Sequence, residues 1–169
     1  EPDDAKHCLL ALAAEEKGSM LVFLRRKVDA EWATKQLEKE GHPVERIHSD
    51  RTQKQRVAAL QGLRQGEHRI LLATDIAARG IDIPIIEHIV NYGPPGSVED
   101  YIHRAGRTAR GALEGTVSTI ATWQDKEDIQ RIEKAIGRPL PRCTLEGVEP
   151  YVERKTTIRG RQKIRRRLT

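Results

Sequence analysis

Short apolar runs alternate with longer segments of helical periodicity along most of the chain. The runs are rich in β-branched and aliphatic residues and show little polar alternation, which is typical of strands buried inside a parallel sheet. Strands are predicted at residues 20–24, 44–48, 69–74, 88–92 and 115–122.

The segments between these runs carry apolar residues every three or four positions. On residues 28–40, for example, Ala30, Ala33 and Leu37 fall on one helical face. Strands that alternate with helices predict an α/β fold, in which a parallel sheet has helices on both faces in three layers, α/β/α. Helices are predicted at residues 4–16, 28–40, 53–64, 98–105 and 125–136.

Composition limits the class of protein. With 169 residues, 37% of them hydrophobic and 33% charged, the chain can bury one ordinary core. Its longest apolar runs are far shorter than the roughly 20 residues that a bilayer span needs, so no transmembrane segment is expected, and a membrane is not among the expected partners. Cys8 and Cys143 form no CxxC or Cys/His cluster, which argues against a disulfide framework and against a metal site. The chain opens without Met or a secretory signal, and we expect it to begin inside a longer protein.

Positive charge is concentrated at the C-terminus. Residues 153–169 hold eight basic side chains and one acidic side chain, whereas the other 152 residues hold 22 basic and 24 acidic ones. We therefore divide the chain into a domain at residues 1–150 and a basic extension at residues 151–169. Two interpretations of the extension stay open, a solvated tail and an RNA-binding segment that neutralises phosphates.

A dense group of polar residues follows the strand predicted at residues 69–74. Within residues 74–84 the sequence has a hydroxyl, two carboxylates, an Arg and a Gly. Ligands of open parallel sheets bind at loops after the carboxyl ends of strands, so we expect a site here. Thr74 as a helix N-cap and Gly80 as a turn residue are the simpler alternatives.

A second group, at residues 101–110, repeats positive charge. Arg104, Arg107 and Arg110 recur every third residue, and such closely spaced cations need an anionic partner. Glu99 and Asp100 could supply it in a salt-bridge network. A polyphosphate fits better, because a guanidinium group can donate two parallel hydrogen bonds to two phosphate oxygens.

The two groups together resemble a known family. The strings ATDIAARGIDIP (residues 73–84) and YIHRAGRTAR (residues 101–110) resemble motifs V and VI of the DEAD-box RNA helicases, in the family's order. Residues 21–24 resemble motif IV, and residues 53–56 resemble the QxxR element. The resemblance covers about residues 5–136 and implies a RecA-like fold. No GxxxxGK[ST] or Asp-Glu-Ala-Asp string occurs, so the chain resembles the second domain of such enzymes without the first.

The resemblance implies roles at the nucleotide. Arg107 and Arg110 would act as arginine fingers on the γ-phosphate of ATP. Gly80 would let the backbone approach the nucleotide, and Asp82 would accept a hydrogen bond from the ribose. ATP with Mg²⁺ would be held mainly by the absent first domain, so this chain alone is not expected to hydrolyse ATP.

Further roles concern RNA and the first domain. Gln53, Arg56 and Thr74 would bind phosphate and sugar oxygens of RNA, which positions a strand without reading its sequence. An exposed helix start is the alternative for Gln53 and Arg56. His103 and Arg79 would face the first domain, a packed histidine being the alternative for His103.

Three residues are given structural or open roles. Arg104 is expected to brace the motif instead of touching a ligand, and Phe23 is expected in the core. Arg26 stands where many relatives have Thr, and either a phosphate contact or plain surface charge would account for it.

The function that follows is the C-terminal domain of an ATP-dependent DEAD-box RNA helicase. Its expected partners are RNA and the N-terminal RecA-like domain, with dimerisation through an exposed face as a further option. The expected compartment is the cytoplasm, or the nucleus if the source is eukaryotic. Two other classes stay open, a non-catalytic RNA- or protein-binding module and a structural domain with an RNA-binding tail.

Overall fold

Five parallel strands form one sheet in the order β2-β3-β1-β4-β5. The computed structural model describes residues 2–108 and 115–143, so Arg110 and the predicted basic extension lie outside the described residues. The strands are β1 (Met20–Leu24), β2 (Val44–Ile47), β3 (Ile70–Thr74), β4 (His88–Tyr92) and β5 (Thr116–Ile120). Each lies within two residues of its predicted position, and the α/β class is confirmed.

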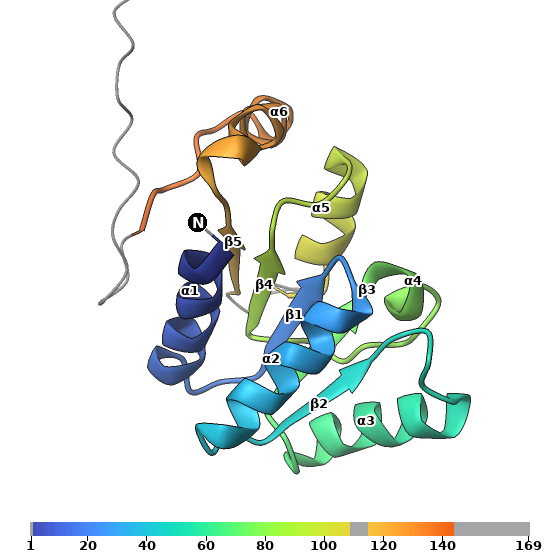
Figure 1. Ribbon diagram of the computed structural model, residues 1–169. Helices are drawn as coiled ribbons and strands as arrows, with labels where there is room; N and C mark the ends of the chain where they lie inside the picture. Colours follow the sequence, from blue (N-terminus) through green and yellow to red (C-terminus); the bar gives the residue numbers. More distant parts are fainter. Residues whose placement is uncertain (1, 109–114, 144–169) are drawn as a thin grey trace, which may run out of the picture.

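Helices cover both faces of this sheet (Figure 1). On one face, α1 (Pro2–Glu15) and α2 (Lys27–Lys39) pack on β1 and β3. On the other lie α3 (Gln53–Gln65), the single turn α4 (Asp75–Ala78) and α5 (Val98–Ala105). After β5, the 3₁₀ turn η1 (Trp123–Asp125) leads into α6 (Lys126–Ile136), which contacts α5. The three-layer arrangement matches the prediction, whereas α4 and η1 were not predicted.

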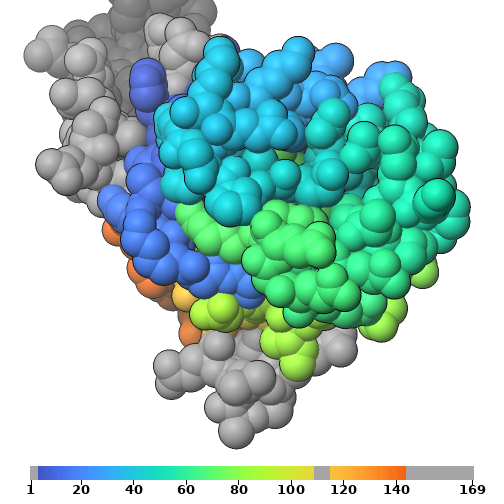
Figure 2. Space-filling model, turned by 90° about the horizontal axis from the view of Figure 1, so that it is seen from below, coloured from blue at the N-terminus to red at the C-terminus, as the bar shows by residue number. Residues whose placement is uncertain are grey.

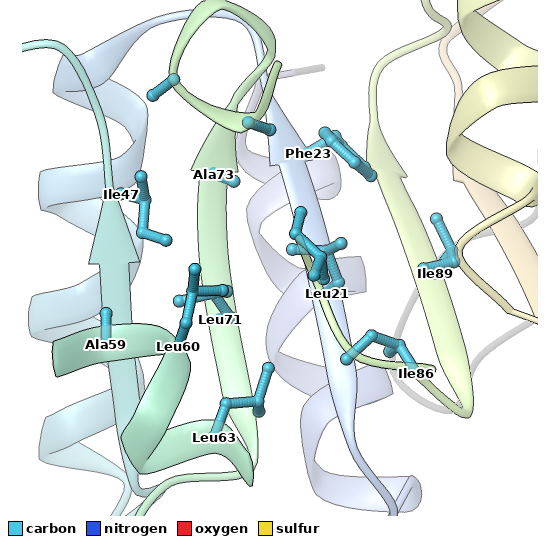
Figure 3. Close-up of a cluster of buried hydrophobic side chains, with 13 residues drawn as sticks. Leu21, Phe23, Ile47, Ala59, Leu60, Leu63, Leu71, Ala73, Ile86 and Ile89 are labelled. Atoms are coloured by element: carbon cyan, nitrogen blue, oxygen red, sulfur yellow. The ribbon is translucent and has the colours of Figure 1, made fainter. Parts of the chain in front are cut away.

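Two apolar clusters hold the layers together. Strand register places Leu21 between Leu71 and Ile89 on the face below α3, where Leu60 and Leu63 of that helix reach the sheet (Figure 3). Because β1 and β3 are buried on both faces, each reads as a continuous apolar run. Phe23 is 4% exposed in this cluster, so its predicted core position is confirmed.

Local sequence signals fix the helix ends. Thr52 and Gln55 form a capping box at the start of α3, and Gly66 ends that helix in the left-handed conformation, with φ of 75°. Ser97 caps α5 by accepting a hydrogen bond from the backbone N–H of Asp100. The start of each helix is therefore set beside the carboxyl end of the preceding strand, where the candidate site lies.

The strands point upward in Figure 1, so the view from below in Figure 2 is onto their amino ends. The N-terminal half of the chain, coloured blue to green, forms most of this face. Among the described residues, no helix is long and apolar enough to cross a membrane.

Candidate functional site

The guanidinium of Arg104 is buried at the carboxyl end of the sheet. Its Nε and Nη2 donate to the two carboxylate oxygens of Asp75 at 3.0 and 2.6 Å. Its Nη1 donates to Oδ1 of Asn91 at 2.8 Å, and the group lies 4.7 Å from the centre of the Phe23 ring. With only 6% of its surface exposed, Arg104 braces the site, as predicted.

This ion pair joins the two groups of polar residues that the sequence separates. Asp75 comes from the first group and Arg104 from the second, 29 positions along the chain. The anionic partner of Arg104 is therefore Asp75, and the expectation that a polyphosphate serves all three arginines is wrong for this one. Neither Glu99 nor Asp100 pairs with Arg104, whose guanidinium donates to Asp75 and Asn91. Asp100 pairs with Arg79 instead.

Arg107 lies just past the end of α5 and is held through its backbone. Its N–H donates to the carbonyl oxygen of Arg104, and its own carbonyl accepts from the N–H of Ile86, both at 3.0 Å. The neighbouring hydroxyl of Thr108 donates to the carbonyl of Glu87 at 3.3 Å. The Arg107 side chain is half-buried, and within the described part of the chain no carboxylate pairs with it. Its backbone is fixed, and no carboxylate of the described residues neutralises its guanidinium.

Arg107 lies away from the carboxyl edge of the sheet. Ile86 and Glu87 directly precede β4, so Arg107 lies near the amino end of that strand. Helix α5 starts after the carboxyl end of β4 and runs back along the sheet. The predicted residues thus extend from the carboxyl edge down one face, and not along the carboxyl edge alone.

Gly80 and Asp82 lie on the exposed segment after α4. Gly80 has φ of 72°, which favours glycine, and a Cβ added there would meet nothing within 4 Å. It is therefore a turn residue with open space in front of its backbone. The Asp82 side chain is 94% exposed, and Arg64 donates to its Oδ2 at 3.1 Å and to its carbonyl oxygen at 2.8 Å. That contact ties the segment to the end of α3.

His103 and Arg79 both lie at the surface. His103 is exposed on α5, so the packed-histidine alternative does not hold. The Arg79 side chain is 73% exposed, with its Nη2 3.7 Å from Oδ1 of Asp100 on α5. This weak pair brings the two predicted interdomain residues onto the surface that α4 and α5 share.

The predicted RNA contacts follow neighbouring strands. Thr74 ends β3 and is 9% exposed; it occupies the N-cap position of α4, but its side chain makes no capping hydrogen bond. Gln53 is exposed at the first position of α3, directly after the loop that leaves β2. Arg56 is half-buried, and its Nε has no partner among the described residues. Since β2 pairs with β3, Thr74 and the start of α3 follow the carboxyl ends of neighbouring strands.

Arg26 forms a surface ion pair, and Asn91 is a buried polar residue that was not predicted. Arg26 donates to both carboxylate oxygens of Asp29, at 2.8 and 2.7 Å, as expected of surface charge. Asn91 is fully buried in β4 and donates to Oγ1 of Thr119 at 3.2 Å while it accepts from Arg104. Its only signal in the sequence is an amide within an apolar run.

Two titratable groups outside the predicted site residues have lowered pKa values. The hydrogen bond from Arg46 lowers the pKa of Glu31, and burial lowers the pKa of His88. No group of three or more His, Cys, Asp or Glu side chains could hold a metal ion within the described ranges.

Comparison with known proteins decides the family. The model of the helicase conserved C-terminal domain matches residues 4–112. The chain belongs to this family. It is 41% identical over 139 residues to the ATP-dependent RNA helicase DBP2 of Lodderomyces elongisporus, and 39% identical over 142 residues to DBP8 of Pyricularia oryzae.

Solved structures narrow the assignment to the DEAD-box branch. The chain superimposes on E. coli SrmB, a DEAD-box protein solved with the regulator of ribonuclease activity A, with a TM-score of 0.82, 27% identity and 90% coverage of both chains. It also matches the C-terminal domain of the DEAD-box protein Dbp5, with a TM-score of 0.75, 31% identity and coverage of 80% and 79%. The chain is a DEAD-box C-terminal RecA-like domain and spans about a quarter of the length of these relatives. The match to DBP2 covers 80% of the chain and 25% of DBP2, and the match to DBP8 covers 84% of the chain and 24% of DBP8.

Proposed function

We propose that this domain works as the second half of a two-domain, ATP-dependent RNA helicase and supplies Arg107 and Arg110 to the γ-phosphate of ATP. The observation that carries the proposal is the Arg107 guanidinium, a half-buried cation that no carboxylate neutralises among the described residues. A fixed cation of this kind stabilises negative charge that develops on phosphate oxygens. For Arg110 the proposal rests on the sequence.

The nucleotide would lie against the segment after α4. The open backbone at Gly80 allows close approach of a ligand, and the exposed Asp82 carboxylate can accept a hydrogen bond from a ribose hydroxyl. In P-loop enzymes, Mg²⁺ is held by the P-loop hydroxyl and a Walker-B carboxylate. Because the sequence has no P-loop string, ATP and Mg²⁺ are assigned mainly to the N-terminal domain.

RNA would bind across the carboxyl ends of β2 and β3. Gln53, Arg56 and Thr74 would contact phosphate and sugar oxygens, which supports binding without sequence preference. The unpartnered Nε of Arg56 agrees with a role for that side chain as a donor to a ligand.

The surface that carries His103 and Arg79 would meet the N-terminal domain when ATP and RNA close the cleft. Each ligand would contact both domains only in the closed state, so each would favour binding of the other. We place this activity in the cytoplasm, or in the nucleus of a eukaryote, and expect any self-association to use the same exposed face.

RNA-stimulated ATP hydrolysis tests the proposal. The two-domain protein is compared with its Arg107→Ala variant, and Arg131→Ala on α6 serves as a matched control because that exposed arginine pairs with Asp128, within its own helix. Loss of turnover in Arg107→Ala alone supports the proposal. Unchanged turnover favours the alternative of a non-catalytic binding module.

A further inference from the structure

A groove of about 600 Å³ opens between α2 and the loop that joins β2 to α3. None of the residues discussed above as nucleotide, RNA or interdomain contacts lines it. One wall comes from residues 27–35 of α2, and the other from the loop and the first turn of α3. The groove is lined by Lys27, Val28, Glu31, Trp32, Lys35, His48, Asp50, Arg51 and Gln55.

The groove continues the direction in which an RNA strand would run along the proposed RNA contacts. Thr74 ends β3, and Gln53 follows β2, which is the edge strand of the sheet. A strand that passes from Thr74 to Gln53 therefore moves toward this edge. Gln55, two residues beyond Gln53, already belongs to the groove lining.

The carboxylates of the groove are already engaged. Asp50 lies 2.8 Å from Nζ of Lys27. Glu31 accepts from Nε of Arg46 and from the imidazole of His48, both at 2.7 Å. The backbone N–H of Asp50 donates to Nδ1 of His48, which leaves the ring proton on Nε2 for Glu31. These acids consequently present little unpaired negative charge to a polyanion.

Two cationic side chains remain for a ligand. Lys35 is exposed on α2 and has no ion-pair partner among the described residues. Arg51 pairs with Glu45 through Nη2 at 3.0 Å, yet its buried Nε has no hydrogen-bond partner among the described residues. A buried donor without an acceptor is uncommon in folded proteins and calls for an explanation. Val28, 56% exposed, and the half-buried Trp32 add an apolar surface suited to a base or sugar.

We propose that this groove binds the next nucleotide of single-stranded RNA beyond the one held at Gln53. Lys35 and Arg51 would contact its phosphate, and Val28 and Trp32 would pack against its base or sugar. The inference rests on the proposed function, because it extends the RNA path assigned there.

A length series of RNA tests the proposal. Affinities of the two-domain protein for oligouridylates from about six to about twelve nucleotides are measured by fluorescence anisotropy with a non-hydrolysable ATP analogue. The variant Lys35→Glu is compared with Lys39→Glu, which changes an exposed lysine one turn further along α2 and outside the groove. Arg56→Ala reports separately on the RNA path of the proposed function.

We expect Lys35→Glu to lower affinity for the longer RNAs at least about fourfold near physiological salt, and to reduce the salt slope by about 0.7, the value for one phosphate contact. Lys35→Glu should bind the shortest RNA with an affinity near that of wild type. Lys39→Glu should do so for RNA of every length. Suppose that Lys35→Glu and wild type bind long RNA equally well, while Arg56→Ala weakens binding at every length. This result would overturn the proposal that the groove binds RNA, but not the RNA path of the proposed function, and would favour a protein ligand for the groove. If Arg56→Ala also has no effect, the RNA path itself is wrong.

Discussion

Arg104 and Asp75 are joined by two parallel hydrogen bonds, from Nε to Oδ1 at 3.0 Å and from Nη2 to Oδ2 at 2.6 Å. Asp75 directly follows Thr74, the proposed RNA contact. Arg104 stands three residues before Arg107, the proposed ATP contact, whose N–H donates to its carbonyl. One ion pair thus connects the proposed RNA-binding and ATP-binding parts of the domain.

Removing this pair should destabilise the fold. In Arg104→Ala, the partly buried Asp75 carboxylate loses its ion-pair partner and the amide oxygen of the buried Asn91 loses its donor. Breaking a buried pair costs about 3–5 kcal/mol, and the 34% exposure of the Asp75 side chain lowers our expectation to about 2–4 kcal/mol. Urea unfolding of this chain measures the change.

The control is Arg131→Ala, which breaks the exposed pair with Asp128 on α6 and should cost less than about 0.5 kcal/mol. If both variants unfold at the same urea concentration, the Arg104 pair contributes nothing to stability and its bracing role is wrong.

Gly80→Ala should destabilise the domain through backbone conformation alone. Gly80 has φ of 72° and open space around the added Cβ, so the cost comes from the left-handed region, about 1–2 kcal/mol. Gly96→Ala is the matched comparison, since its Cβ also meets nothing within 4 Å and its φ is not in that region. It should be neutral or slightly stabilising. Equal unfolding midpoints for both variants would contradict the stated role of the Gly80 turn.

The sequence predicted the sheet well because its strands are buried. The continuous apolar runs at residues 20–24 and 70–73 are too short for a buried helix and long enough for a buried strand, and turn residues mark the helix ends. Helix α4 was not predicted, because a single turn, Asp75–Ala78, is too short to show a helical period.

The arginine repeat shows what the sequence could not resolve. A spacing of three suggests equivalent side chains, but α5 ends at Ala105 and separates Arg104 from Arg107. Arg104 points into the sheet from the last turn, whereas Arg107 lies beyond the helix near the amino end of β4. The partner of Arg104 depends on how α5 crosses the sheet, and 29 residues separate the pair, so local pattern could not identify it.

Stability should fall as the pH is lowered through the histidine range. Burial lowers the pKa of His88 below its ordinary value near 6.5, and Glu16, 3.6 Å away, opposes that shift only in part. Burial and Arg69 lower the pKa of His42 in the same way. The unfolded chain therefore binds more protons in this window, so the stabilisation is complete above about pH 6.5 and is lost as pH falls toward the folded-state values.

Urea unfolding at about pH 7.5 and about pH 5.5 measures this loss. His88→Gln should reduce the difference between the two pH values, and His42 should contribute to what remains. Gly96→Ala, which removes no titratable group, provides the control and should leave the difference unchanged. A pH difference that is the same in wild type and His88→Gln would rule out His88 as its source.

The central claim is that Arg107 meets the γ-phosphate of ATP. The most direct test is the turnover of ATP by the two-domain protein at saturating RNA, wild type beside Arg107→Ala and Arg110→Ala, with this chain alone as the blank. The account predicts an active wild type, a silent blank and a loss of at least about a hundredfold in each variant, with RNA binding retained. Wild-type turnover in Arg107→Ala would contradict the account and move the search for function to the basic C-terminal segment.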